Sequence, residues 1–205
     1  MRIQLENLSK RYQYEWIFRN LNRTLLPHQS YAILGPNGSG KSTLLQVIAG
    51  FLTPSGGKIR YFDQGKELTP ESIHRYLIIA APYLELIEEF TLRELLNFHR
   101  QFKPFKDQLS SENLIEILKL GKSTHKPVKF FSSGMKQRLK LGLAFYANVP
   151  LILLDEPTTN LDATGVAWYQ EEINRLLGQK LIIICSNQPA EYAFCEKTIH
   201  IHEYK

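Results

Sequence analysis

Unbroken apolar runs and runs with helical spacing alternate along this chain of 205 residues. Residues 1–34 alternate apolar and polar positions in places, a pattern typical of strands. Apolar runs over 151–154 and 181–185 predict buried strands, with a helical pattern over 163–177 between them. A final strand is expected over 197–201. Because continuous apolar strands between helices favour a parallel sheet covered on both faces, we expect an α/β fold.

The middle of the chain has a different character. Helical spacing recurs there three times, over 91–102, 111–120 and 134–148. We therefore expect one domain over 1–205, with an α/β core and β-region formed by 1–82 and 151–205, and a helical subdomain over 83–150. The length of the chain suits a single compact domain of this kind.

The most informative motif is the nonapeptide Gly35–Thr43, which reads GPNGSGKST. It matches the phosphate-binding pattern GxxxxGK[ST], and it lies between an apolar run and a helical pattern, the context in which that pattern binds phosphate. Glycines let backbone N–H groups point inward, and the helix N-terminus favours anions. We expect Lys41 to reach the β- and γ-phosphates and Ser42 to offer its hydroxyl to Mg²⁺. The candidate nucleotide-binding residues of this loop are Gly35, Pro36, Asn37, Gly38, Ser39, Gly40, Lys41, Ser42 and Thr43.

Two carboxylates, Asp155 and Glu156, directly follow the apolar run 151–154. In a parallel sheet, ligands collect at the carboxyl ends of the strands. We expect Asp155 to hold Mg²⁺, directly or through a water, and Glu156 to polarise or orient an attacking water. A strand that merely ends in solvated acids is the alternative, and a phosphate loop elsewhere in the chain disfavours it.

A second helix start that suits anions is the segment Ser132–Met135, which reads SSGM at the beginning of a predicted helix. A small protein with two such helix starts is expected to use one of them on a second molecule.

These motifs, in this order and approximate spacing, resemble the ATP-binding subunit of prokaryotic ABC transporters over essentially the whole chain. The resemblance implies a P-loop NTPase fold of the ABC-ATPase type, with a mainly parallel sheet, an antiparallel β-region and a helical subdomain. It implies ATP and Mg²⁺ as ligands, ATP hydrolysis coupled to transport, and a separate transmembrane permease as partner. It also implies a head-to-tail homodimer or heterodimer, in which each ATP lies between the phosphate loop of one subunit and the signature motif of the other.

The resemblance carries roles over to individual positions. Asp155 becomes the Walker B aspartate, Glu156 the catalytic glutamate, and Tyr12 the aromatic residue that stacks on adenine. Tyr14 and Trp16 are nearby alternatives to Tyr12, although packing within a β-region explains these two equally well. The implied signature residues are Ser132, Ser133, Gly134 and Met135, and the implied D-loop residues are Asn160, Leu161 and Asp162.

Three departures from the family pattern matter. The usual signature LSGGQ reads FSSGM here, which we take as the mark of an exporter-type subgroup. The position of the switch histidine is occupied by Asn187, whose amide can bond a γ-phosphate oxygen but cannot shuttle a proton. The glutamine of the Q-loop falls at or near Pro82, and no glutamine occurs between 65 and 100. We therefore expect ATP binding with slow or partner-dependent hydrolysis.

Composition and charge indicate the expected partners and cellular location of the protein. The net charge is +5, but the basic residues are scattered and no nucleic-acid-binding motif is present, so we expect no nucleic-acid partner. No run approaches the roughly 20 apolar residues that span a bilayer, and no signal-peptide core is present. A cytoplasmic protein, peripheral to the inner face of the membrane, is expected. Of the two cysteines, Cys185 is expected to be a buried structural thiol.

A separate membrane partner would need a docking surface. Its candidates are Tyr83, Leu84, Leu86, Ile87 and Phe90, with acidic residues beside them. Ordinary packing of a loop–helix junction explains this cluster equally well. A second hypothesis for the whole chain is an ATP-dependent switch outside transport, which the Asn187 and Pro82 departures favour modestly. A nucleotide kinase or GTPase is remote, because their accompanying motifs are absent.

Overall fold

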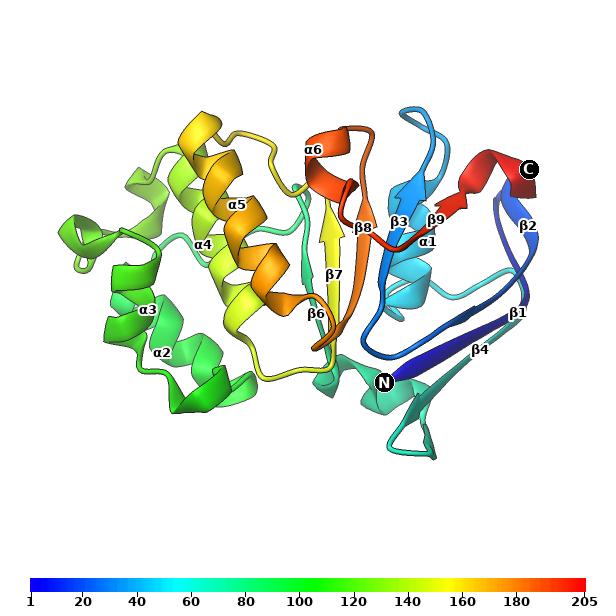
Figure 1. Cartoon of the computed structure of the whole chain (residues 1–205), viewed down its shortest axis with the longest axis horizontal. Helices are drawn as coiled ribbons and strands as arrows, with labels where there is room; N and C mark the ends of the chain where they lie inside the picture. The colour runs from blue at the N-terminus through cyan, green and yellow to red at the C-terminus, as the bar shows by residue number, and fades with distance from the viewer.

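The computed structural model describes all residues 1–205, which form a parallel sheet, an antiparallel sheet and the helices that cover them (Figure 1). The parallel sheet has five strands and confirms the predicted α/β class. In spatial order its strands are β6 (Leu77–Ala80), β7 (Leu151–Asp155), β8 (Leu181–Cys185), β3 (Ser30–Leu34) and β9 (Lys197–His200).

The antiparallel sheet has four strands and contains the N-terminus. In spatial order they are β2 (Glu15–Leu25), β1 (Arg2–Tyr12), β4 (Gly56–Asp63) and β5 (Lys66–Leu68). Ile3 and Leu5 of β1 are buried, because alternate residues of a strand point to the same face. This face packs on the same core as helix α1 (Lys41–Ile48), so the β1–β2 hairpin is held on the side of the parallel sheet that carries α1.

The helical segments lie mostly between β6 and β8 in the sequence. The α-helices are α2 (Leu92–Phe102), α3 (Ser111–Ile117), α4 (Ser133–Tyr146), α5 (Ala163–Leu176) and α6 (Pro189–Tyr192); the 3₁₀ turns are η1 (Pro70–Arg75), η2 (Lys106–Gln108), η3 (Gly121–Ser123), η4 (Val128–Phe130) and η5 (Ile201–Tyr204).

Two predicted helices end earlier than their apolar spacing indicates. Helix α3 stops at Ile117 because Lys119 adopts a left-handed conformation with φ 55°, and the N–H of Leu120 turns back to the carbonyl of Ile115 at 3.0 Å. Helix α4 stops at Tyr146 because Ala147 is extended and pairs with Phe105 in an isolated bridge.

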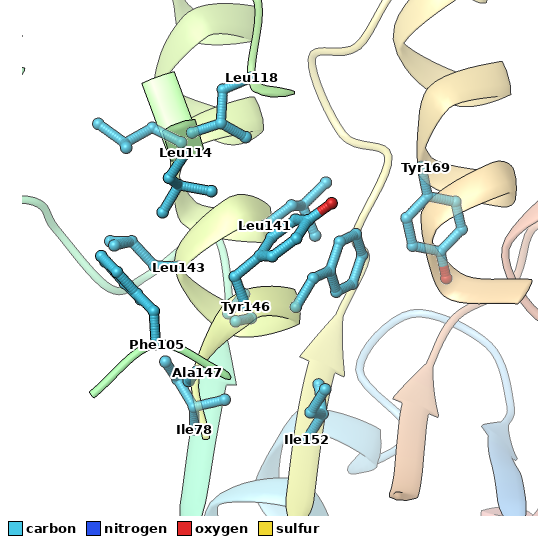
Figure 2. Packing of buried hydrophobic residues seen from close by; sticks show 14 of the residues in the cluster. Ile78, Phe105, Leu114, Leu118, Leu141, Leu143, Tyr146, Ala147, Ile152 and Tyr169 are labelled. Atoms are coloured by element: carbon cyan, nitrogen blue, oxygen red, sulfur yellow. The ribbon is translucent and has the colours of Figure 1, made fainter. Parts of the chain in front are cut away.

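The central strands are apolar at every position because side chains on both of their faces are buried. Leu151 and Leu153 face the core that contains α1 and the antiparallel sheet, whereas Ile152 and Leu154 face the core beneath α4 and α5. Figure 2 shows Ile152 with the side chains of the second core, among them Tyr169. Because both faces are covered, alternation of apolar and polar residues is lost.

Candidate functional site

The loop between β3 and α1 has a backbone path that requires glycine. Gly40 has φ 104°, and a Cβ atom built on it would lie 2.3 Å from Cγ2 of Ile17 on β2. No L-residue side chain fits at that distance, so the β1–β2 hairpin packs directly against the loop. The N–H of Ser39 donates to the carbonyl of Pro36 at 3.1 Å, which closes the turn inside the loop.

Lys41 begins α1 and is buried despite its charge. Its Nζ donates to the carbonyl of Gly35 at 2.8 Å and to the carbonyl of Pro36 at 3.2 Å. The ammonium group therefore lies back over the loop, and carbonyl oxygens compensate its charge. This holds a positive charge at the glycine-rich loop, where a phosphate group could pair with it.

Asp155 ends β7 and is almost fully buried. Burial raises its pKa, the Ser42 side chain lowers it, Glu156 raises it, and the Lys41 ammonium lowers it. Its Oδ1 atom is buried without a hydrogen-bond partner. Because a buried carboxylate oxygen without a partner is costly, this atom fits a cation ligand, with the Ser42 hydroxyl as its neighbour.

Glu156 follows in a strained conformation, with φ 44°. Its N–H donates to the carbonyl of Cys185 at 2.9 Å, and its carbonyl accepts from the N–H of Thr159 at 3.2 Å, so the backbone is tied on both sides. The side chain reaches the pocket of the phosphate loop. That pocket, which we call the loop pocket, is lined by Ile17, Asn37, Gly38, Ser39, Gly40, Lys41, Ser42, Thr43 and Glu156.

Asn187 lies at the edge of the loop pocket. It follows β8, the neighbour of β3 in the sheet. Its Nδ2 donates to Oδ1 of Asn37 at 2.7 Å. The structure therefore brings the phosphate loop, Asp155, Glu156 and Asn187 together at the carboxyl ends of the parallel strands.

The candidate signature and D-loop residues line a second hollow. Ser132 caps α4 and accepts from the N–H of Met135 at 3.2 Å. Gly134 packs so closely on the D-loop that a Cβ there would lie 3.0 Å from the carbonyl oxygen of Asn160. This hollow shares no residue with the loop pocket; its lining is Leu118, Lys119, Leu120, Ser132, Ser133, Gly134, Met135, Arg138, Asn160, Leu161 and Asp162.

The candidate adenine-stacking residue, Tyr12, lies outside the loop pocket. Tyr12 ends β1, is about half exposed at 47%, and has the Lys10 ammonium 5.2 Å from its ring centroid. It does not line the loop pocket, where Ile17 is the hairpin residue in contact. Ile17 carries no chemical signal in the sequence, so only the fold identifies it.

The segment after β6 contains Pro82 and Tyr83. Lys140 Nζ donates to the carbonyl of Ala81 at 3.3 Å and to that of Pro82 at 3.4 Å, which holds the segment against α4. Burial raises the pKa of Tyr83 to about 12; the Gln46 side chain lowers it, and the Asp155 carboxylate raises it. The Tyr83 phenol therefore lies near the side chains of Gln46 and Asp155, one residue after Pro82, where the sequence predicts the position of the family's glutamine.

Comparisons with known proteins agree with this geometry. A family profile described as ABC transporter matches residues 18–159, which is more than half of the chain. The chain belongs to the ABC transporter family. It is 30% identical over 190 residues to the lantibiotic transport ATP-binding protein SrtF of Streptococcus pyogenes, covering 90% of this chain and 79% of that protein. It is 31% identical to the cytochrome c biogenesis ATP-binding export protein CcmA of Brucella abortus, covering 91% and 85% respectively.

Solved structures match the whole fold of this ABC transporter ATP-binding domain. A putative ABC transporter ATP-binding protein from Pyrococcus furiosus superposes with a TM-score of 0.82 at 20% identity, over 100% of both chains. The dimeric structure of MJ0796, titled a bacterial ABC transporter cassette, gives 0.81 at 25% identity over 97% of this chain and 93% of that one. None of this chain's helices combines the length and the hydrophobicity that a membrane-spanning helix requires.

Proposed function

We propose that this chain binds Mg²⁺ and ATP at the loop pocket and hydrolyses ATP slowly as the motor subunit of an exporter-type ABC transporter. The observation that carries the proposal is the convergence of Lys41, Asp155 and Glu156 around one glycine-rich loop. Lys41 and the loop N–H groups would hold the β- and γ-phosphates. Mg²⁺, held by Ser42 and by Asp155 directly or through a water, would neutralise phosphate charge. Glu156 would orient the attacking water, with Asn187 beside it.

The separation of the two hollows supports a dimer. Ser132–Met135 and Asn160–Asp162 lie together but line no part of the loop pocket. A second subunit, turned head to tail, would bring its signature residues onto the phosphates bound by the first. The dimeric MJ0796 cassette is a relative with the same fold, and it supports this arrangement for our chain.

We further propose that a separate transmembrane permease docks beside the segment that follows β6. Tyr83 and Ile87 are exposed there, whereas Leu86 and Phe90 pack partly against the core. Ile87→Asp should leave ATP hydrolysis by the purified chain unchanged. The same substitution should remove any stimulation by a co-expressed membrane subunit, because a buried charge at the contact is costly.

The test of the proposed function is ATP hydrolysis by the purified protein, with dimerisation followed by light scattering. We expect wild type to turn over slowly and Glu156→Gln to stop hydrolysis while it traps an ATP-bound dimer. Asn187→His should raise the rate if the missing imidazole limits catalysis. Binding and dimerisation with no hydrolysis, even after Asn187→His, would instead support an ATP-dependent switch.

A further inference from the structure

Glu191 of α6 is a buried carboxylate that lies outside the loop pocket and has no part in the mechanism above. Its exposed fraction is 0%, and no lysine, arginine or histidine nitrogen lies within 4.0 Å of it. A buried carboxylate without a basic partner must be stabilised by hydrogen-bond donors. The donors come from two separate segments of the chain.

Each carboxylate oxygen serves one of these segments. Oε1 accepts from the backbone N–H of Thr158 at 2.7 Å and from its hydroxyl at 2.5 Å. Oε2 accepts from the hydroxyl of Ser186. Glu191 therefore bridges the loop after β7 and the loop after β8, at a place where no backbone ladder joins them.

The bridge is anchored from outside both loops. The hydroxyl of Tyr169 on α5 donates to the backbone carbonyl of Glu191 at 2.8 Å, and Tyr169 is itself fully buried in the core. Glu191 is thus fixed to α5. Because of this bond, α6 cannot follow a shift of one loop without also moving relative to α5.

Both bridged loops carry groups of the proposed site. Thr158 lies two residues after Glu156, and Ser186 directly precedes Asn187. Ser186 Oγ also accepts from the N–H of Gln188 at 2.8 Å, so the bonds enclose Asn187 on both sides in the sequence.

We propose that Glu191 is a positioning residue that fixes the loop of Glu156 and the loop of Asn187 relative to each other. The carboxylate does not line the loop pocket, and it acts by locking two loops into one geometry. Because catalytic groups must be held to within a fraction of an ångström, loss of this lock should lower turnover more than ATP binding. The inference rests on the proposed ATP hydrolysis, but the lock itself exists without nucleotide.

The test uses Ser186→Ala, which removes one arm of the bridge and leaves the Thr158 bonds in place. A buried serine outside both bridged loops, Ser9 on β1, offers the matched control in Ser9→Ala. We expect Ser186→Ala to speed hydrogen exchange about threefold or more at the amides of 158–161, which its hydroxyl never touches. We also expect kcat to fall about fivefold or more while KM for ATP changes less than about twofold.

Ser9→Ala should change neither exchange at the amides of 158–161 nor kcat. Glu191→Ala should speed exchange at 158–161 at least as much as Ser186→Ala, because it removes the carboxylate oxygens that serve both loops. Faster exchange confined to 186–188, or an effect on KM alone, would overturn the inference. If wild type fails to hydrolyse ATP, the proposed function fails, whereas the exchange experiment still decides whether Glu191 joins the loops.

Discussion

Asn187 and Asn37 are 150 positions apart in the sequence, yet the Nδ2 of Asn187 donates a 2.7 Å hydrogen bond to the Oδ1 of Asn37. Both side chains are exposed, so water competes for the bond and its net contribution to folding is small. The bond matters instead for the position of the Asn187 side chain. The bond orients the Asn187 side chain toward Asn37 of the glycine-rich loop in the absence of nucleotide.

This contact predicts that the two asparagines act together. Asn187→Ala should lower kcat for ATP hydrolysis about tenfold, because it removes the amide beside the γ-phosphate position. Asn37→Ala should lower kcat less, about threefold, because the amide remains but loses its orientation. The measurement is steady-state ATP hydrolysis by the two variants and by the double variant.

The double variant decides whether the effects are linked. If Asn37 acts through Asn187, the double variant should be no slower than Asn187→Ala alone. Multiplicative effects of the two substitutions would show independent roles and contradict the prediction.

A second prediction concerns the packing of the hairpin on the phosphate loop. Gly40→Ala places a methyl group 2.3 Å from Ile17, whereas Gly38→Ala meets no atom within 4 Å, although Gly38 also has a positive φ of 75°. Both substitutions also strain the backbone, each by at least about 1–2 kcal/mol, and the clash adds to this strain only at Gly40. We expect Gly40→Ala to weaken binding of a fluorescent ATP analogue about tenfold more than Gly38→Ala.

A rescue variant checks the cause. Ile17→Ala in the Gly40→Ala background removes the contacting methyl group and should restore part of the affinity. If the pair of substitutions binds no better than Gly40→Ala alone, the clash with Ile17 does not explain the loss.

The elements of this fold that could be predicted from the sequence are those with local signals. The phosphate loop, with Lys41 at the start of α1, is a short contiguous motif whose geometry depends on its own glycines. The strand ending at Asp155 was visible because a strand buried on both faces is apolar throughout. The apolar run 181–185 matched β8 at both ends for the same reason.

What the sequence could not show depends on contacts between distant segments. The bond from Asn187 to Asn37 requires β8 to lie beside β3, and neither asparagine carries a signal of that neighbour. Ile17 is an ordinary apolar strand residue until the hairpin is placed against Gly40. Glu191 follows a proline and an alanine in a short helix, and its partners are fixed only by tertiary structure.

A third prediction follows from the buried Asp155. Its pKa is raised above the usual 3.8, so the charged form lowers the stability of the nucleotide-free protein at neutral pH. Asp155→Asn should therefore raise the free energy of unfolding at pH 7 by on the order of 1–3 kcal/mol while it abolishes Mg²⁺-dependent ATP binding. Chemical denaturation across a pH series measures the first effect.

The sign of the pH dependence distinguishes this cause from better packing. The advantage of Asp155→Asn should be complete above the raised pKa, shrink as the pH falls through it, and vanish below about 3.8, where both native and unfolded carboxyls are protonated. Asp162 is a contrast, because the N–H of Gly165 and the hydroxyl of Thr164 lower its pKa. Asp162→Ala should destabilise the protein at pH 7, and that loss should shrink on acidification.

A fourth prediction concerns His99 on α2, whose Nε2 is buried without a partner and whose ring stacks on Phe105 at 5.9 Å. Burial and the Lys103 ammonium lower its pKa from 6.5 to about 4. Between pH 6.5 and about 4, His99 is protonated in the unfolded chain but neutral in the native protein. The free energy of unfolding should therefore fall by on the order of 1–3 kcal/mol as the pH drops from 7 to 4. His99→Phe should remove that part of the slope in chemical denaturation. Lys103→Gln should narrow the pH range over which stability falls, because it removes the second cause of the lowered pKa of His99. An unchanged pH dependence of unfolding in His99→Phe would assign the acid sensitivity to other groups.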